Sequence, residues 1–327
     1  MTERKKILIT GSTGFIGSHL AELCVELGFD VVAFDRYNPN NHWGWLEDSK
    51  YMNDMEVILG DVRDYDSVNK AMYGCDVVFH LAALIGIPYS YISPLAYIRT
   101  NVEGTYNVLE AAKNLNLEQV LITSTSEVYG TAQYIPINEN HPQVGQSPYS
   151  ASKIAADQLA ISYFRSFDLN VKIARPFNTY GPRQSPRAVI PTIISQCYSD
   201  NRELRLGNID PTRDLTFVKD TCTAFLEIFK SDEFFGKVTN IGMNTEISIE
   251  DLAHEIMNIM NVDLSIINDN KRVRPENSEV ERLVCDNQKL LKSSSWKSKY
   301  DLKEGLIETI NWFQENKHLY KAGLYHI

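Results

Sequence analysis

The chain has 327 residues, of which 43% are hydrophobic and 23% are charged, and its formal net charge is −10. This composition is ordinary for a soluble globular enzyme with a substantial core. The acidic balance argues against nucleic-acid binding, which needs a basic face. The longest apolar stretch, Val77 to Ile87, is interrupted by His80 and is too short to span a bilayer, so no membrane association is expected.

The cysteines are odd in number, scattered, and never spaced as Cys-x-x-Cys; they are Cys24, Cys75, Cys197, Cys222 and Cys285. This pattern argues against a disulfide framework and against structural zinc, so no metal is expected. The first residues run straight into a strand without the apolar region of a signal peptide. A reducing, cytoplasmic location is therefore expected.

The chain opens with a predicted strand at 6–10 followed by the glycines Gly11, Gly14 and Gly17. Apolar residues then recur at helical spacing up to Gly28, an expected C-cap. Glycines let the backbone turn sharply and let a pyrophosphate approach the N-terminus of the helix, where free N–H groups and the helix dipole favour anions. A glycine triplet alone could be an ordinary tight turn, but its place between strand and helix favours dinucleotide binding.

A second strand is predicted at 31–34 and ends in Asp35, 18 residues beyond Gly17. An acid at this position can accept hydrogen bonds from a ribose diol. Because Asp35 would repel a 2′-phosphate, NAD is expected as the cofactor. Arg36 follows directly and keeps NADP as the less favoured alternative.

The alternation of strand and helix continues, with strands expected at 56–59, 76–83, 120–123 and 171–174 and a helix at 101–114. Asp61 follows one of these strands and could contact the adenine amino group or, alternatively, cap a helix. His80 lies in an apolar run and is interpreted as structural. Repeated strand–helix units predict an α/β fold, a Rossmann doubly wound parallel sheet that binds ligands at the carboxyl ends of its strands.

The strand at 120–123 is followed by Ser124, Thr125, Ser126 and Glu127, so three hydroxyls and a carboxylate lie near a strand end. Further on, Tyr149 and Lys153 are four residues apart, on one face of a predicted helix. An ammonium beside a phenol favours the phenolate and lowers its pKa. Such a pair could also arise by chance on a surface, but the dinucleotide-binding pattern before it favours a catalytic role.

After residue 177 the alternation weakens, which predicts a smaller mixed α/β C-terminal lobe. We expect an NAD-binding domain over 1–177, with a return near 215–245, and a region over 178–327 that mainly binds substrate. Helices are predicted at 189–198, 249–260 and 301–316, and short strands at 204–206, 214–218 and 238–241. Ser248 and Asp251 have the spacing of a capping box.

Taken together, these motifs resemble the extended short-chain dehydrogenase/reductase family, whose NAD-dependent epimerases and dehydratases act on nucleotide-linked sugars. The resemblance covers nearly the whole chain and rests on Gly11-x-x-Gly14-x-x-Gly17, Asp35, Asp61-Val62, His80-Leu-Ala-Ala83, Asn101, Tyr149-x-x-x-Lys153, Arg175-Pro-x-Asn178 and Arg213-Asp214. It implies cofactor contacts from Gly11, Thr13, Gly14, Phe15, Ile16, Gly17, Asp35, Arg36, Asp61, Val62, Leu81, Ala82, Ala83, Asn101, Tyr149 and Lys153.

Within that family the run Thr125-Ser126-Glu127 is similar to the 4,6-dehydratases. GDP-mannose dehydratases carry Thr-Ser-Glu here, whereas dTDP-glucose dehydratases carry Thr-Asp-Glu, so Ser126 favours a guanosine nucleotide. The chain further resembles the GDP-N-acetylglucosamine 4,6-dehydratases of bacterial legionaminic acid biosynthesis. The family also implies a homodimer formed through a four-helix bundle of the helices at 101–114 and 149–167.

The resemblance implies a redox-neutral lyase reaction in which Tyr149 takes the proton from the sugar O4 while hydride leaves C4. Lys153 would lower the Tyr149 pKa, and Thr125 would hydrogen-bond O4. Glu127 would remove the C5 proton, water would leave from C6, and hydride would return to C6. Because the Ser126 hydroxyl is a poor acid, Glu127 is expected to act as base and then as acid.

Arg213 and Arg274 are the expected ligands of the substrate diphosphate, and Arg187 is a third candidate, since guanidinium matches phosphate oxygens. Asn178 could bind the sugar or a phosphate oxygen. Two alternatives remain: a 4-epimerase of the same fold, which needs no C5 base, and a non-catalytic NAD-binding regulator. The second would usually lack the pair Tyr149 and Lys153.

Overall fold

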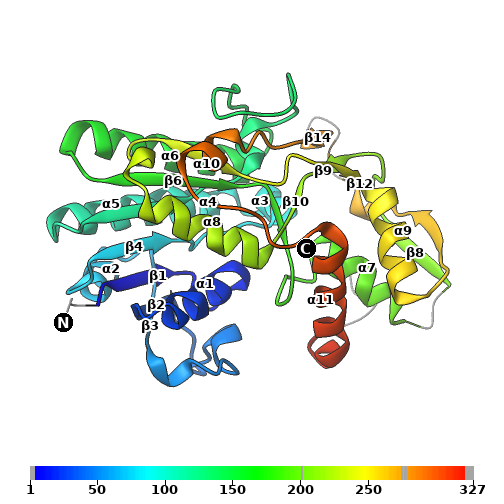
Figure 1. Ribbon diagram of the computed structural model, residues 1–327, viewed down its shortest axis with the longest axis horizontal. Helices are drawn as coiled ribbons and strands as arrows, with labels where there is room; N and C mark the ends of the chain where they lie inside the picture. Colours follow the sequence, from blue (N-terminus) through cyan, green and yellow to red (C-terminus); the bar gives the residue numbers. More distant parts are fainter. Residues whose placement is uncertain (1–3, 200–201, 274, 276–277, 321–327) are drawn as a thin grey trace.

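The computed structural model describes residues 4–199, 202–273, 275 and 278–320 (Figure 1). Its central element is a seven-stranded parallel sheet in the order β11-β6-β5-β4-β1-β2-β3. The strands are β1 (Lys6–Thr10), β2 (Asp30–Arg36), β3 (Met55–Gly60), β4 (Val77–His80), β5 (Gln119–Thr123), β6 (Val171–Pro176) and β11 (Val238–Ile241). The predicted Rossmann-type α/β fold is confirmed, including the return of the chain to the sheet at 238–241.

Side chains alternate between the two faces of the sheet and build two cores. Ile7 and Ile9 pack on one face, and Leu8 packs on the other. The first face is covered by α1 (Phe15–Glu26) and α8 (Val218–Lys230), and the second by α2 (Tyr65–Met72), α5 (Gly104–Asn114) and α6 (Pro148–Phe167). Both faces are therefore buried, as expected for a parallel sheet.

Short helical segments connect these elements. The chain between β4 and α5 forms α3 (Ile87–Ile92), α4 (Pro94–Tyr97) and a π-helical segment, η3 (Ile98–Glu103). The helix predicted to begin at Asn101 thus continues a π-helical segment, and its α-helical part begins at Gly104. Among the residues that the structure describes, 3₁₀ segments complete the connections: η1 (Gly44–Leu46), η2 (Met52–Asp54), η4 (Ser126–Tyr129), η5 (Asp232–Phe234) and η6 (Asn270–Arg272).

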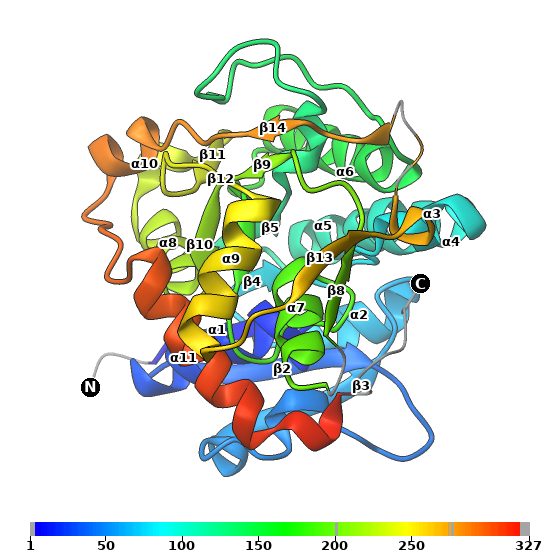
Figure 2. The same ribbon diagram turned by 90° about the vertical axis from the view of Figure 1, so that its right-hand side faces the viewer.

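The C-terminal part forms a smaller lobe of short sheets and helices beside the carboxyl ends of the strands (Figure 2). Its strands pair as β7 (Asn178–Tyr180) with β10 (Leu215–Phe217), β8 (Glu203–Leu206) with β13 (Ser265–Asn268), and β9 (Thr212–Arg213) with both β12 (Ile247–Ser248) and β14 (Arg282–Leu283). The helices of the lobe are α7 (Val189–Cys197), α9 (Ile249–Met260) and α11 (Leu302–Glu315), the last followed by η8 (Lys317–Leu319), whereas α10 (Gln288–Ser293) packs beside β11 of the main sheet.

One local prediction differs from the structure in detail. The Ser248 hydroxyl caps α9 by accepting a hydrogen bond from the Asp251 N–H at 3.0 Å, but it also donates to the Asp251 carboxylate, so the reciprocal bond of a capping box is replaced. A capping box does open α11, between Asp301 and Glu304. In the described part of the chain, no helix is long and apolar enough to cross a membrane.

Candidate active site

A cleft of about 1230 Å³ lies where the carboxyl ends of the main strands face the C-terminal lobe. It is lined by the glycine turn after β1, the ends of β2 to β6, the start of α6 and loops of the lobe. This is the edge at which doubly wound sheets bind ligands. The sequence-predicted residues are brought together here, with Asn101 as an exception and Arg274 outside the described residues.

The glycine turn presents the N-terminus of α1 to the cleft. Gly14 is the N-cap residue and supplies no side-chain hydrogen bond, and Thr13, Phe15, Ile16 and Gly17 line the cleft beside it. Gly11 has φ +71°, and a Cβ there would lie 2.8 Å from the Ala82 nitrogen. The turn therefore requires glycine, and the helix end fits the pyrophosphate of a dinucleotide.

Asp35 lies at the end of β2 and lines the cleft with Arg36. Its Oδ2 accepts hydrogen bonds from the Thr13 N–H at 2.9 Å and the Thr13 hydroxyl at 2.6 Å, while Oδ1 accepts from the Arg36 N–H at 2.6 Å. The carboxylate thus holds the phosphate-binding turn and remains placed for a ribose.

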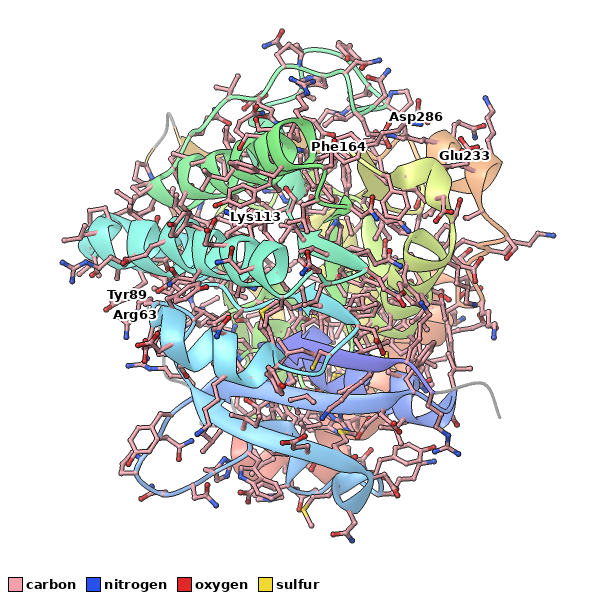
Figure 3. The ribbon with its side chains drawn as sticks, turned by 90° about the vertical axis from the view of Figure 1, so that its left-hand side faces the viewer. Arg63, Tyr89, Lys113, Phe164, Glu233 and Asp286 are labelled. Atoms are coloured by element: carbon pink, nitrogen blue, oxygen red, sulfur yellow. The ribbon has the colours of Figure 1, made fainter. Side chains whose placement is uncertain are left out.

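Asp61 lies just after β3 and forms an ion pair with Arg63. Both residues line the cleft, and Arg63 lies at one edge of the molecule in Figure 3. The hydrogen bond from the Arg63 side chain lowers the pKa of Asp61. Helix α2 is capped by Asp64, whose side chain accepts from the Asp66 N–H. The alternative role of Asp61 as a helix cap is therefore wrong.

The end of β4 supports the inner wall of the cleft, where Leu81, Ala82, Ala83 and Val62 line it. His80 is buried between the hydroxyls of Thr10 and Thr105, 2.8 and 3.2 Å from its ring nitrogens, and burial lowers its pKa to about 3. This buried, hydrogen-bonded setting agrees with the interpretation of His80 as a structural residue.

Asn101, an expected cofactor contact, does not line the cleft as the described residues define it. Its side chain is 1% exposed, accepts from the Leu84 N–H at 2.8 Å and donates to the Leu84 carbonyl and the Ser152 hydroxyl. Asn101 therefore supports the cleft wall through Leu84. Its family motif carried no information about this internal bonding.

Thr125, Ser126 and Glu127 lie at the start of η4 and line the cleft. Thr125 is the N-cap, and its hydroxyl accepts from the Glu127 N–H at 3.3 Å. Gly130 ends the segment with φ +64°, and a Cβ there would lie 2.8 Å from the Gln146 side-chain oxygen. Glycine at this position therefore lets the chain turn tightly at the end of η4, against the Gln146 side chain.

Tyr149 and Lys153 project from the first turns of α6, which begins with a capping box between Ser147 and Ser150. Both side chains are buried and line the cleft. Lys153 Nζ donates to the Thr123 carbonyl at 2.6 Å, and burial lowers the pKa of Lys153 while the Asp157 carboxylate opposes this. The helix thus brings the phenol and the ammonium to the end of β5.

The protonation of Tyr149 differs from the expectation that Lys153 would lower its pKa. In the structure, burial raises the pKa of Tyr149 above its ordinary value, and the Glu127 charge raises it further. A hydrogen bond with Thr125 opposes the rise but does not cancel it. A further positive charge in the cleft would favour the phenolate.

The expected substrate ligands lie along the lobe side of the cleft. Asn178 and Arg187 line it, as does Arg213, whose Nη2 is 3.2 Å from the Glu279 carboxylate and whose Nη1 donates to the Thr212 carbonyl at 2.9 Å. Arg274 lies outside the described residues.

Several cleft residues were missed by sequence reasoning. Polar examples are Tyr91, Gln184, Arg272 and Glu279. The Tyr91 hydroxyl is 2.5 Å from that of Ser278, 187 residues later in the chain, and Arg272 pairs with Asp269 at 3.3 Å. For Arg272, the run of basic residues Lys271, Arg272 and Arg274 is a signal in the sequence that could have found it.

Comparison with known proteins places this cleft in a family. Residues 8–309 match the family described as GDP-mannose 4,6 dehydratase. The chain is 31% identical to the human dTDP-D-glucose 4,6-dehydratase over 97% of this chain and 92% of that one. It is 30% identical to a putative UDP-glucose 4-epimerase of Methanocaldococcus jannaschii over 95% of this chain and 99% of that one.

Among solved structures, the chain is similar to the dTDP-glucose 4,6-dehydratase DesIV from Streptomyces venezuelae with NAD and TYD bound. The TM-score is 0.88 at 26% identity, covering 97% of this chain and 99% of that chain. The fold and the cleft define an extended short-chain dehydrogenase/reductase, and the chain belongs to the GDP-mannose 4,6 dehydratase family of NAD-dependent nucleotide-sugar dehydratases and epimerases.

Proposed function

We propose that the protein is a lyase, an NAD-dependent nucleotide-sugar 4,6-dehydratase, and that GDP-N-acetylglucosamine is its substrate. The observation that carries the reaction is the place of Glu127 in the cleft, in the same short turn as Thr125 and close enough for its charge to raise the Tyr149 pKa. Removal of a C5 proton requires a carboxylate close to Thr125 and Tyr149, the residues proposed to bind O4 and take its proton. The nucleotide and the sugar rest on the resemblance of Thr125-Ser126-Glu127 to guanosine-specific relatives.

The uncapped end of α1 and Asp35 fit NAD, which would supply a hydride acceptor for the sugar C4 and the hydride returned to C6. Tyr149 would take the O4 proton, and Lys153 would hold the nicotinamide ribose. The positive charge of a bound nicotinamide would offset the burial that raises the Tyr149 pKa. Thr125, hydrogen-bonded to Tyr149, would also bond O4 and orient it for proton transfer.

Glu127 would then remove the C5 proton, which the C4 ketone acidifies, and would deliver it to the C6 hydroxyl, which leaves as water. When the hydride returns to C6, C5 would take up a proton from solvent. Ser126 is 2% exposed and lies next to Glu127, so its hydroxyl can orient the sugar but is too weak an acid to protonate it. One carboxylate would thus serve as both base and acid on one face of the sugar.

Arg213, Arg187 and Arg274 are proposed to bind the diphosphate, and Asn178 the sugar or a phosphate oxygen. Since Arg213 is paired with Glu279, the substrate would have to share or replace that carboxylate as its partner. The proposed division of labour is an NAD-binding region over 1–177 and a substrate-binding region mainly over 178–327.

We also propose a homodimer through α5 and α6, which lie side by side in Figure 3 with Lys113 and Phe164 labelled on them. Tyr106 on α5 and Phe167 on α6 are 45% and 52% exposed. A four-helix bundle would cover these apolar side chains.

The second candidate is a 4-epimerase, which the similarity to the putative UDP-glucose 4-epimerase favours. The purified protein, incubated with a panel of GDP-, UDP- and dTDP-linked hexoses and N-acetylhexosamines, separates the two. We expect loss of one water from GDP-N-acetylglucosamine, seen by mass spectrometry. A product of unchanged mass would support the epimerase, and no product from any sugar would support a non-catalytic role.

A further inference from the structure

The buried guanidinium of Arg175 lies behind the catalytic segment, defined as residues 124–130. Arg175 on β6 and Asp157 on α6 are both 0% exposed, and the Arg175 Nη2 is 2.6 Å from the Asp157 Oδ2. Neither residue lines the cleft as the described residues define it. A buried ion pair of this kind is costly to desolvate and by itself gives no reason to be retained for stability.

The pair reaches the first residue of the catalytic segment. The Ser124 hydroxyl donates to the Asp157 Oδ2 at 2.6 Å, and the Arg175 Nε donates to the same hydroxyl at 3.3 Å. Ser124, which immediately precedes Thr125, is therefore held by both partners of the ion pair.

The same guanidinium also reaches the far end of the segment. The Arg175 Cζ lies 4.7 Å from the centre of the Tyr129 ring, which packs over it as a cation–π partner. The Tyr129 hydroxyl in turn donates to the Asn240 Oδ1 at 2.7 Å, on β11. Arg175 thus contacts the residues that precede Thr125 and follow Glu127.

We infer that Arg175, anchored by Asp157, is a positioning residue that clamps the catalytic segment at both ends and so sets the directions of Thr125 and Glu127. A planar guanidinium can bond Ser124 in its plane and stack on Tyr129 with its face, which a lysine cannot do at once. The inference rests on the proposed catalytic roles of Thr125 and Glu127. A small displacement of such reacting groups can cost about 100-fold in rate.

The chain supplies a matched control on the same strand. Lys172 is also 0% exposed, donates to the Phe229 carbonyl at 2.6 Å and lies 4.2 Å from the centre of the Phe235 ring. Lys172→Met therefore removes a buried, stacked cation from β6 that does not contact the segment. Arg175→Lys is the test variant. If it does not fold, the double variant Asp157→Asn/Arg175→Met, which removes both charges of the pair, takes its place.

The experiment compares amide hydrogen exchange of residues 124–130, kcat, KM and the isotope effect with substrate deuterated at C4. For Arg175→Lys or the double variant we expect at least tenfold faster exchange in the segment. We also expect kcat to fall by about 100-fold, KM to change little, and the isotope effect to differ from that of the wild type. Lys172→Met should change none of these beyond a lower Tm.

Equal exchange and equal kcat in the test and control variants would overturn the inference. Removal of hydride from C4 is common to dehydratases and epimerases, so the isotope effect can be measured whichever reaction follows. If the wild-type protein forms an epimer, the proposed function fails, while the exchange comparison still decides the role of Arg175.

Discussion

Arg183 and Glu22 form a bidentate ion pair, with the Arg183 Nη1 and Nη2 3.0 and 2.9 Å from the two Glu22 oxygens. Glu22 lies on α1, whose N-terminus faces the cleft, and Arg183 lies in the loop that carries Arg187. The His19 ring nitrogen is also 3.1 Å from the Pro182 carbonyl. Helix α1 therefore fixes the loop that carries Arg183 and the proposed substrate ligand Arg187.

Glu22→Gln should loosen this loop without touching the reacting groups. We expect KM for the nucleotide sugar to rise by up to about fivefold with kcat unchanged, since a partly exposed ion pair contributes about 1 kcal/mol or less. Steady-state kinetics test this. Glu203→Gln, which breaks the exposed pair with Arg205, is the control and should leave KM unchanged. Equal KM values in the two variants would contradict the prediction.

Glu127→Gln should abolish elimination while leaving substrate binding intact. A general base contributes about 100- to 10,000-fold, so we expect dehydration to slow by at least about 100-fold. The matched control is Ser126→Ala, the neighbouring cleft residue, which should lose less than about tenfold. Mass spectrometry of the product and calorimetry of binding give the readouts. Retained dehydration in Glu127→Gln would remove this residue from the mechanism.

Asp35→Asn should shift cofactor preference toward NADP. The substitution removes the charge that would repel a 2′-phosphate and keeps an oxygen that can accept from Thr13. We expect the ratio of the two dissociation constants to shift by about tenfold or more, equivalent to about 1.4 kcal/mol. Calorimetric titration measures it, with the exposed Asp48→Asn as control. An unchanged ratio would show that Asp35 does not select the cofactor.

His80 should make the protein sensitive to acid. Burial lowers its pKa to about 3, below the ordinary 6.5. Between these two pH values the unfolded chain binds a proton at His80 that the folded chain does not bind. The stabilisation is present above about pH 6.5 and is lost as the pH falls toward 3, at up to roughly 1.4 kcal/mol per pH unit.

Urea unfolding of His80→Gln between pH 7 and pH 4 checks this. The variant should be less stable at pH 7 and should lose stability less steeply on acidification. The exposed His254→Gln should follow the wild-type slope. Parallel curves for His80→Gln and the wild type would contradict the assignment.

Periodicity and turn chemistry predicted much of the fold. The first strand was predicted at its observed bounds, 6–10, and helix α9 was predicted over 249–260, as observed. The π-helical segment Ile98–Glu103 carried no such signal, because its spacing differs little from that of an α-helix over six residues.

Long-range polar pairing was the part that the sequence could not provide. Asp157 lies on a helix where a carboxylate is ordinarily solvent-exposed, and Arg175 lies in a strand where its family motif gave it no role. Likewise, the partner of Arg213 is Glu279, 66 residues later. Such pairs depend on how distant segments meet in the fold, and local patterns do not encode that.

The dehydration claim is tested most directly by running the reaction in deuterated water with GDP-N-acetylglucosamine. Removal of the C5 proton by Glu127 and hydride return to C6 predict a product that has lost one water and carries one deuteron at C5. A sugar nucleotide of unchanged mass, with protium retained at C5, would contradict the account.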